Sequence, residues 1–150
     1  MAILLIAEHN NKELRPFTLN AATAASQIDS DVHAVIIGQN TAEAAKQLSE
    51  LSVIKKVLSV EAAHYENFTA ENFTPVIVKL AENYSHIVCS ANTFGKNLMP
   101  RIAANLDDTS TPKSEAAISS IGFFLAFIIF GSDAYLGSCL LYTSDAADEL

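Results

Sequence analysis

Short apolar runs alternate with amphipathic segments along the first two thirds of the chain. Apolar runs of this kind are typical of strands that are buried on both faces of a sheet. The predicted strands are residues 3–7, 32–37, 56–60 and 86–89. Between them, apolar residues recur at every third or fourth position, which is typical of helices packed on one side. The predicted helices are residues 16–26, 41–51, 70–83 and 93–106.

The alternation of strand and helix predicts the fold class. Four strands joined by helical crossovers must run parallel, with helices on both faces of the sheet. We therefore predict an α/β domain with a Rossmann-like open, mostly parallel sheet. We also expect this sheet to be incomplete at its C-terminal end, which would leave an unpaired strand edge and favour association.

The character of the sequence changes after Leu106. Residues 107–115 are rich in Ser, Thr and Asp, as a linker is, and residues 116–132 carry no charge. This apolar run is near the lower limit of about 17 residues for a membrane helix. It lacks flanking basic residues, so we favour a strand-and-turn element or sequence foreign to the domain over a membrane anchor.

Residues 139–149 resemble translated sequencing-adapter sequence at the ends of metagenomic reading frames. We therefore divide the chain into a domain at residues 1–106 and a divergent segment at 107–150, with a linker, an apolar run and an artefactual tail. The functional residues are expected within the first of these.

The charge composition argues against some classes of function. The 150 residues include 9 Lys and Arg against 17 Asp and Glu, which gives a formal net charge of −8. Such a surface repels nucleic-acid phosphates, and the longest basic run is Lys55–Lys56. No basic residue precedes the first apolar run, and Glu8 follows it, which argues against a targeting peptide.

Neither cysteine belongs to a metal-binding or redox motif. Cys89 and Cys139 form no CxxC pair, and no His/Cys cluster has metal-ligand spacing, so we predict no metal site. Cys89 lies in a predicted strand and is expected to be buried and inert.

The turn after the fourth predicted strand contains a weak candidate for an anion site. Thr93, Gly95 and Lys96 begin a helix there, where free N–H groups can bind phosphate or carboxylate. Neither a dinucleotide fingerprint nor a P-loop is present. The favoured alternative is structural: Thr93 caps the helix, Gly95 permits close packing and Lys96 is solvated.

No catalytic set can be assembled from the remaining polar residues. The histidines are scattered, and His86 is expected to be a structural residue at the start of a strand. Glu8 ends the first strand, where a ligand site of an α/β domain would form, but a lone carboxylate is more often a loop or interface residue. Phe68 and Phe73 are expected in the core.

Several blocks of the sequence resemble one family in the right order and spacing. The segments are ILLIAEH at 3–9, LRPFTLN at 14–20, DVHAVIIG at 31–38, VL at 57–58, and YSH at 84–86 through TFGKNLMPR at 93–101. Over residues 1–106, the chain resembles the N-terminal domain of electron transfer flavoprotein alpha subunits.

The resemblance implies a function as part of a heterodimer. Alpha and beta subunits of this family together carry electrons from flavin dehydrogenases, such as those of fatty acid oxidation, to a quinone oxidoreductase. The FAD belongs mainly to the second domain of the alpha subunit, so no cofactor-binding residue is carried onto this chain. The resemblance implies a scaffold domain without a catalytic site, in the bacterial cytoplasm or the mitochondrial matrix.

A second hypothesis is a stand-alone nucleotide-binding domain of the universal-stress-protein type. Such a domain shares the α/β architecture but needs a glycine-rich phosphate loop late in the chain. Gly122, Gly131 and Gly137 lack that context.

Overall fold

The computed structural model describes residues 2–108, 115–121 and 124–130. The elements are β1 (Ile3–Ile6), α1 (Pro16–Ile28), β2 (Val32–Gly38), α2 (Ala42–Ser49), β3 (Ile54–Glu61), the 3-10 turn η1 (Ala63–Tyr65), α3 (Ala70–Ala81), β4 (His86–Ser90), α4 (Thr93–Asp108), β5 (Glu115–Ile121) and β6 (Phe124–Phe130).

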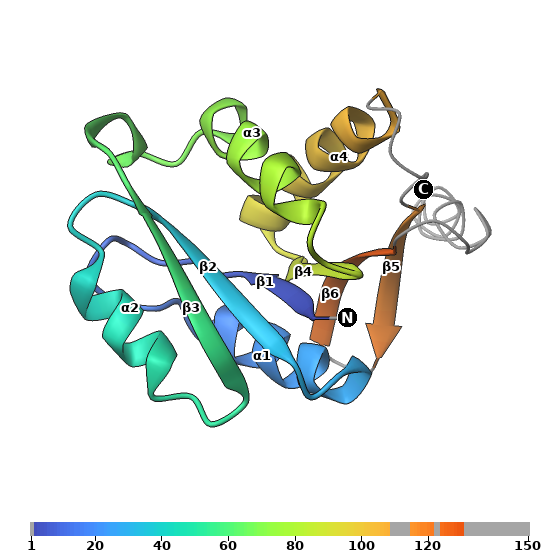
Figure 1. The fold of residues 1–150 in the computed structure, drawn as a ribbon, viewed down its shortest axis with the longest axis horizontal. Coiled ribbons are helices and arrows are strands. Elements are labelled where there is room, and N and C mark those ends of the chain that lie inside the picture. The colour runs from blue at the N-terminus through green and yellow to red at the C-terminus, as the bar shows by residue number, and fades with distance from the viewer. Residues whose placement is uncertain (1, 109–114, 122–123, 131–150) are drawn as a thin grey trace, which may run out of the picture.

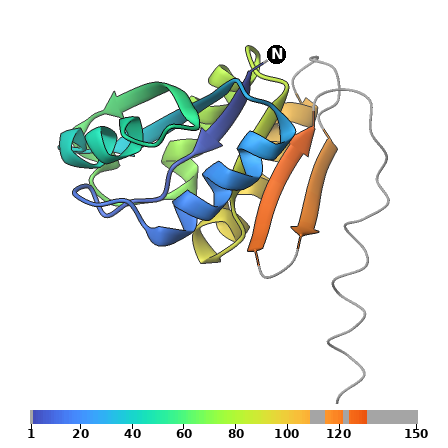
Figure 2. The same ribbon diagram turned by 90° about the horizontal axis from the view of Figure 1, so that it is seen from below.

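The strands form one sheet in the order β3-β2-β1-β4-β6-β5. The first four run parallel, with Ile3 opposite both Val32 of β2 and His86 of β4. Helices lie on both faces of these strands, as Figures 1 and 2 show. The predicted Rossmann-like α/β fold is therefore confirmed.

Two apolar cores lie on opposite faces of the parallel strands. Ile3 and Leu5 of β1 pack into the core beneath α1 and α2, whereas Leu4 and Ile6 pack into the core beneath α3 and α4. Successive side chains of a strand point to opposite faces. A strand buried on both faces is consequently apolar throughout, which explains the unbroken run at the start of the chain.

The crossovers change face between α2 and α3. The chain moves outward from β1 to β3 over one face and returns to β4 over the other, so β1 and β4 are neighbours whose following helices lie on opposite faces. In open α/β sheets, this topological switch point leaves a crevice at the carboxyl ends of the strands.

The observed β3 is longer than the predicted strand at both ends. This strand begins at Ile54, although Lys55 and Lys56 interrupt its apolar pattern. Both lysines are exposed because β3 is the edge of the sheet, and lysines on an edge discourage pairing with another chain. The helices α2 and α3 each end two residues earlier than the apolar periodicity indicated.

We expected a sheet that is incomplete at its C-terminal end, but β4 has partner strands on both sides among the described residues. β6 pairs antiparallel with β4, from His86 opposite Phe130 to Ser90 opposite Ala126, and β5 pairs with β6. The backbone N–H and C=O groups of β4 thus find partners on both sides. Residues 115–121 and 124–130 form strands, in keeping with the strand-and-turn alternative.

Within the described ranges, no helix is long and apolar enough to cross a bilayer. Of the predicted linker at 107–115, residues 107 and 108 end α4 and Glu115 begins β5. Residues 109–114 and the adapter-like residues at 139–149 lie outside the described residues.

Candidate functional site

A cleft lies at the carboxyl ends of β1 and β2, beside the start of α4 at the switch point. Its volume is about 530 Å³, within the range of about 300–1,000 Å³ that is usual for small-molecule sites. Four segments line it: the loop after β1, the end of β2, the segment that leads to α3 with the start of that helix, and the start of α4. The lining residues are Glu8, His9, Asn10, Asn11, Arg15, Ile37, Tyr65, Glu66, Asn67, Phe68, Phe73, Thr93, Phe94 and Asn97.

Glu8 ties the end of β1 to its neighbours. Its Oε2 accepts hydrogen bonds from Asn92 Nδ2 at 2.5 Å and from Ser90 Oγ at 3.3 Å. Its backbone N–H donates to Thr18 Oγ1, and the same hydroxyl donates to the Glu8 carbonyl, both at 2.9 Å. Glu8 therefore joins β1, α1 and the turn after β4, which is a structural role.

The first turn of α4 is capped by Asn92, so the prediction that Thr93 is the cap is wrong. Asn92 Oδ1 accepts the backbone N–H of Gly95 at 3.2 Å, and its carbonyl accepts that of Lys96 at 2.8 Å. The side-chain oxygens of both residue types can accept N–H groups of the first turn, and asparagine is the more favourable N-cap of the two. Both Thr93 and Lys96 are exposed.

Gly95 packs directly beneath the turn after β4. A Cβ atom added at Gly95 would lie 1.8 Å from the carbonyl oxygen of Ser90. The glycine thus permits the close approach of α4 to β4. Of the three anion-site candidates, only Thr93 lines the cleft. The anion site at Thr93, Gly95 and Lys96 stays a prediction, and the packing favours the structural alternative.

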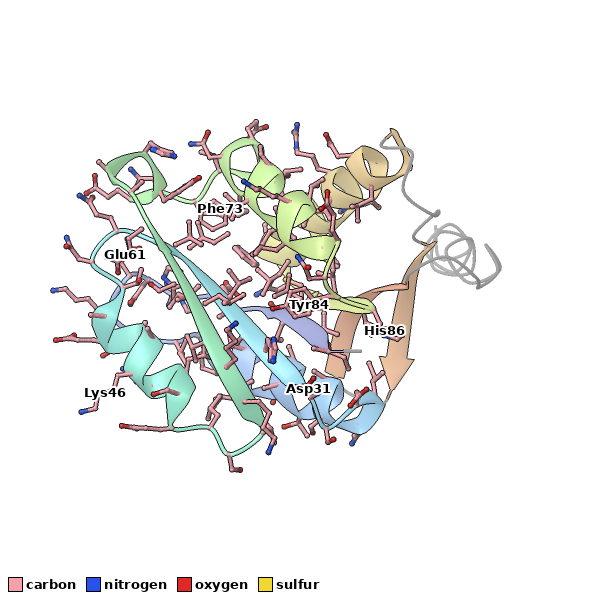
Figure 3. The ribbon with its side chains drawn as sticks, in the orientation of Figure 1. Asp31, Lys46, Glu61, Phe73, Tyr84 and His86 are labelled. Carbon is pink, nitrogen blue, oxygen red and sulfur yellow. The ribbon has the colours of Figure 1, made fainter. Side chains whose placement is uncertain are left out.

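An aromatic cluster forms one wall of the cleft. Phe68 packs edge-on against Phe73 with ring centroids 5.0 Å apart, and it lies 4.5 Å from the centroid of Phe94. Phe73 is buried, as expected, but Phe68 is 37% exposed. The core assignment therefore holds for Phe73, whereas Phe68 belongs to the cleft wall. In Figure 3, Phe73 and Glu61 lie toward the carboxyl ends of the strands.

A second polar cluster lies at the opposite end of the sheet, where Figure 3 labels Asp31, Tyr84 and His86. His33 Nε2 lies 3.2 Å from Asp31 Oδ1, and His33 Nδ1 lies 3.0 Å from the Tyr84 hydroxyl. Burial, with a smaller contribution from Asp31, raises the pKa of Tyr84, so this phenol is not an activated nucleophile. Sequence analysis missed the cluster because its members come together only in the fold.

The other titratable candidates are also structural. His86 Nδ1 lies 2.9 Å from Ser85 Oγ, and burial lowers the pKa of this histidine. Cys89 is fully buried, and that burial raises the pKa of its thiol to about 12. The described residues contain no group of three His, Cys, Asp or Glu side chains that could hold a metal ion.

Together, the parallel sheet, the switch-point cleft and the structural use of its polar residues define a Rossmann-like α/β domain. The family model for the electron transfer flavoprotein domain matches residues 3–111. The chain belongs to the electron transfer flavoprotein family.

Relatives that match this chain are alpha subunits of that family. The electron transfer flavoprotein subunit alpha of Pseudomonas aeruginosa is 46% identical over 107 residues, which cover 71% of this chain and 35% of the relative. That of Paracoccus denitrificans is 39% identical over 107 residues, with the same coverage of both chains. The mitochondrial subunit of Dictyostelium discoideum is 38% identical over 112 residues, covering 69% of this chain and 32% of the relative.

The chain spans about a third of the length of the curated relatives it matches. The match supports an N-terminal alpha-subunit domain and gives no support to the universal-stress-protein alternative.

The described residues do not fit the FAD that the family implies. FAD carries two phosphates, which proteins commonly hold with free N–H groups at a helix N-terminus and with cations. At α4, Asn92 already accepts the Gly95 N–H, and the Glu8 carboxylate lies beside it. Glu66 adds a second carboxylate to the cleft. Arg15 is the one Lys or Arg among the lining residues, so a diphosphate would meet more negative than positive charge here.

Replacing Gly95 with alanine tests the close packing at α4. Alanine inside a helix is ordinarily about 1 kcal/mol more favourable than glycine. Here the added Cβ would collide with the Ser90 carbonyl. We expect Gly95→Ala to lower the free energy of unfolding in urea by about 1–3 kcal/mol. The control Lys96→Ala, at an exposed neighbouring position, should change it by less than about 0.5 kcal/mol. A stabilised Gly95→Ala protein would contradict the packing.

Alkylation tests whether Cys89 is inert. The thiolate is the reactive form of cysteine, and the raised pKa of Cys89 leaves almost none at neutral pH. We expect iodoacetamide to modify Cys89 at least about 100-fold more slowly in the native protein than in urea at about pH 8. Peptide mass spectrometry distinguishes Cys89 from Cys139. Equal rates in the two conditions would refute the assignment.

Proposed function

We propose that this chain is the scaffold domain of an electron transfer flavoprotein alpha subunit and pairs with a beta subunit. The complex would carry electrons from flavin dehydrogenases to a quinone oxidoreductase or a similar acceptor. The observation that carries the proposal is the family match over residues 3–111, together with 46% identity to an alpha subunit.

The geometry supports a scaffold role over a catalytic one. Glu8, the polar residue at the switch point, is engaged with Asn92 and Ser90. The thiol of Cys89 is buried, and the Tyr84 phenol has a raised pKa. We therefore propose that the domain has no catalytic site and that FAD binds in another part of the full heterodimer.

The proposed setting follows the relatives, which include bacterial and mitochondrial proteins. We propose the bacterial cytoplasm or the mitochondrial matrix, with no nucleic-acid partner because the chain carries a formal net charge of −8. We also propose that the family domain ends near Leu106 and that residues 107–150 form a divergent segment. The family match itself extends to residue 111.

Capture by a beta subunit tests the proposed function. We expect the purified chain to co-elute with an electron transfer flavoprotein beta subunit in size-exclusion chromatography with light scattering. An unrelated protein of similar net charge serves as a control for charge-driven association. We expect no flavin absorbance in the peak of the chain alone after incubation with FAD.

Two results would contradict this proposal. If the chain is folded by circular dichroism but does not co-elute with the beta subunit, the proposed scaffold role is wrong. Stoichiometric FAD retention by the chain alone, lost in Glu8→Ala but kept in Lys96→Ala, would place the cofactor in the cleft instead.

A further inference from the structure

The loop between β1 and α1 folds over the carboxyl ends of the strands and lines the cleft. Its ends are drawn together by the Arg15 N–H, which donates to the Glu8 carbonyl at 2.9 Å, and by a bridge between His9 and Leu14. The Asn10 N–H donates to the Glu13 carbonyl at 3.1 Å. These contacts fix the shape of the loop, whereas other contacts hold it against the sheet.

His9 uses both nitrogens of its ring: Nδ1 bonds within the loop, and Nε2 joins the loop to β2. Nδ1 accepts the backbone N–H of Asn11 at 2.9 Å, and Nε2 lies 3.0 Å from the carbonyl oxygen of Ile37. A backbone N–H can only donate and a carbonyl can only accept. Nδ1 must therefore be without a proton and Nε2 must carry one. The two backbone partners select a single neutral form of His9.

Asn11 extends this connection to two further segments. Its Nδ2 donates to the Glu66 carbonyl at 2.8 Å, and its Oδ1 accepts the Gln39 N–H at 3.3 Å. Asn11 has a φ of 71°, in the left-handed region that asparagine tolerates better than most residues. Losing the bond from the Asn11 N–H to His9 would therefore also disturb the contacts with the turn after β2 and the segment after η1.

We propose that His9 is a pH-sensitive latch that holds the loop at residues 8–15 over the cleft. A proton on Nδ1 would put two donors, Nδ1–H and the Asn11 N–H, against each other in place of a hydrogen bond. The loop would then release Asn11, and the cleft wall that this loop forms would loosen. The inference rests on hydrogen-bond geometry and does not depend on the proposed function.

The surroundings of His9 set the direction of the pH dependence. Burial disfavours the imidazolium and is the dominant effect, so the pKa of His9 is lowered from its ordinary 6.5. The Ile37 carbonyl and then the Glu8 carboxylate oppose this effect. The ionisable and charged groups on the neighbouring segments are Glu8, Lys12, Glu13, Arg15, Glu61, His64, Tyr65, Glu66 and Lys96.

Because the pKa of His9 is lower in the latched form than in the released form, acid favours release of the loop. Above about pH 6.5, His9 is neutral in both forms and the latch is at full strength. As the pH falls from there toward the lower pKa of the latched form, the released form binds the proton more readily and gains population. Below the pKa of the latched form, the effect is complete.

Amide hydrogen exchange tests the latch on the intact chain. We expect the protection factor of the Asn11 amide, corrected for intrinsic exchange, to fall by up to about tenfold per pH unit below about pH 6.5. Nitrogen-15 shifts of the His9 ring at about pH 7.5 should report a protonated Nε2 and a bare Nδ1. This measurement needs no variant.

His9→Asn separates the latch from general acid sensitivity. An asparagine oxygen accepts the N–H two residues later without titrating. We expect Asn11 to stay protected in this variant across the pH range. His86→Gln removes another histidine with a lowered pKa and should leave the wild-type pH dependence unchanged. The proposal is overturned by a wild-type Asn11 protection factor independent of pH, by pH dependence that persists in His9→Asn, or by a protonated Nδ1 at about pH 7.5.

Discussion

The fold depends on the burial of β1 between two strands and two layers of helices. Ile3–Ile6 are at most 2% exposed, and their side chains alternate between the two apolar cores. A parallel strand that is buried on both faces is apolar along nearly its whole length. The constraint therefore fixes both the composition of the strand and the place where the chain first becomes polar.

The chain first becomes polar at the switch point, where its polar residues form hydrogen bonds that hold neighbouring elements together. Glu8 joins the turn after β4 and the start of α1, and His9 joins the loop to β2. Asn92 accepts the N–H that would otherwise be available to an anion at α4. In many α/β domains this position receives a ligand phosphate. Here a carboxylate and an amide occupy it, which agrees with the proposed scaffold role.

Sequence pattern predicted the parts of the fold that depend on local periodicity. The four parallel strands and their helices follow from burial on both faces, and Pro16 marks the first turn of α1. The start of β3 was missed because edge lysines conceal its pattern. The pairing of β6 with β4 is a contact between distant segments, which periodicity does not encode.

The candidate site was predictable only in its location. The carboxyl ends of the strands follow from the topology, but the bonds of Glu8 to residues more than 80 positions away do not. The choice of Asn92 over Thr93 as the cap depends on where the helix begins within one residue, which a sequence rarely determines. The two hydrogen bonds of the His9 ring likewise require the folded loop.

We expect β1 to be the most protected element of the fold because both apolar cores depend on it. Native-state hydrogen exchange of the intact chain tests this directly. The account predicts that the amides of Leu4, Leu5 and Ile6 exchange only through global unfolding, whereas those of the edge strand β3 exchange through smaller openings. Amides of β1 that exchange as fast as those of β3 would contradict it.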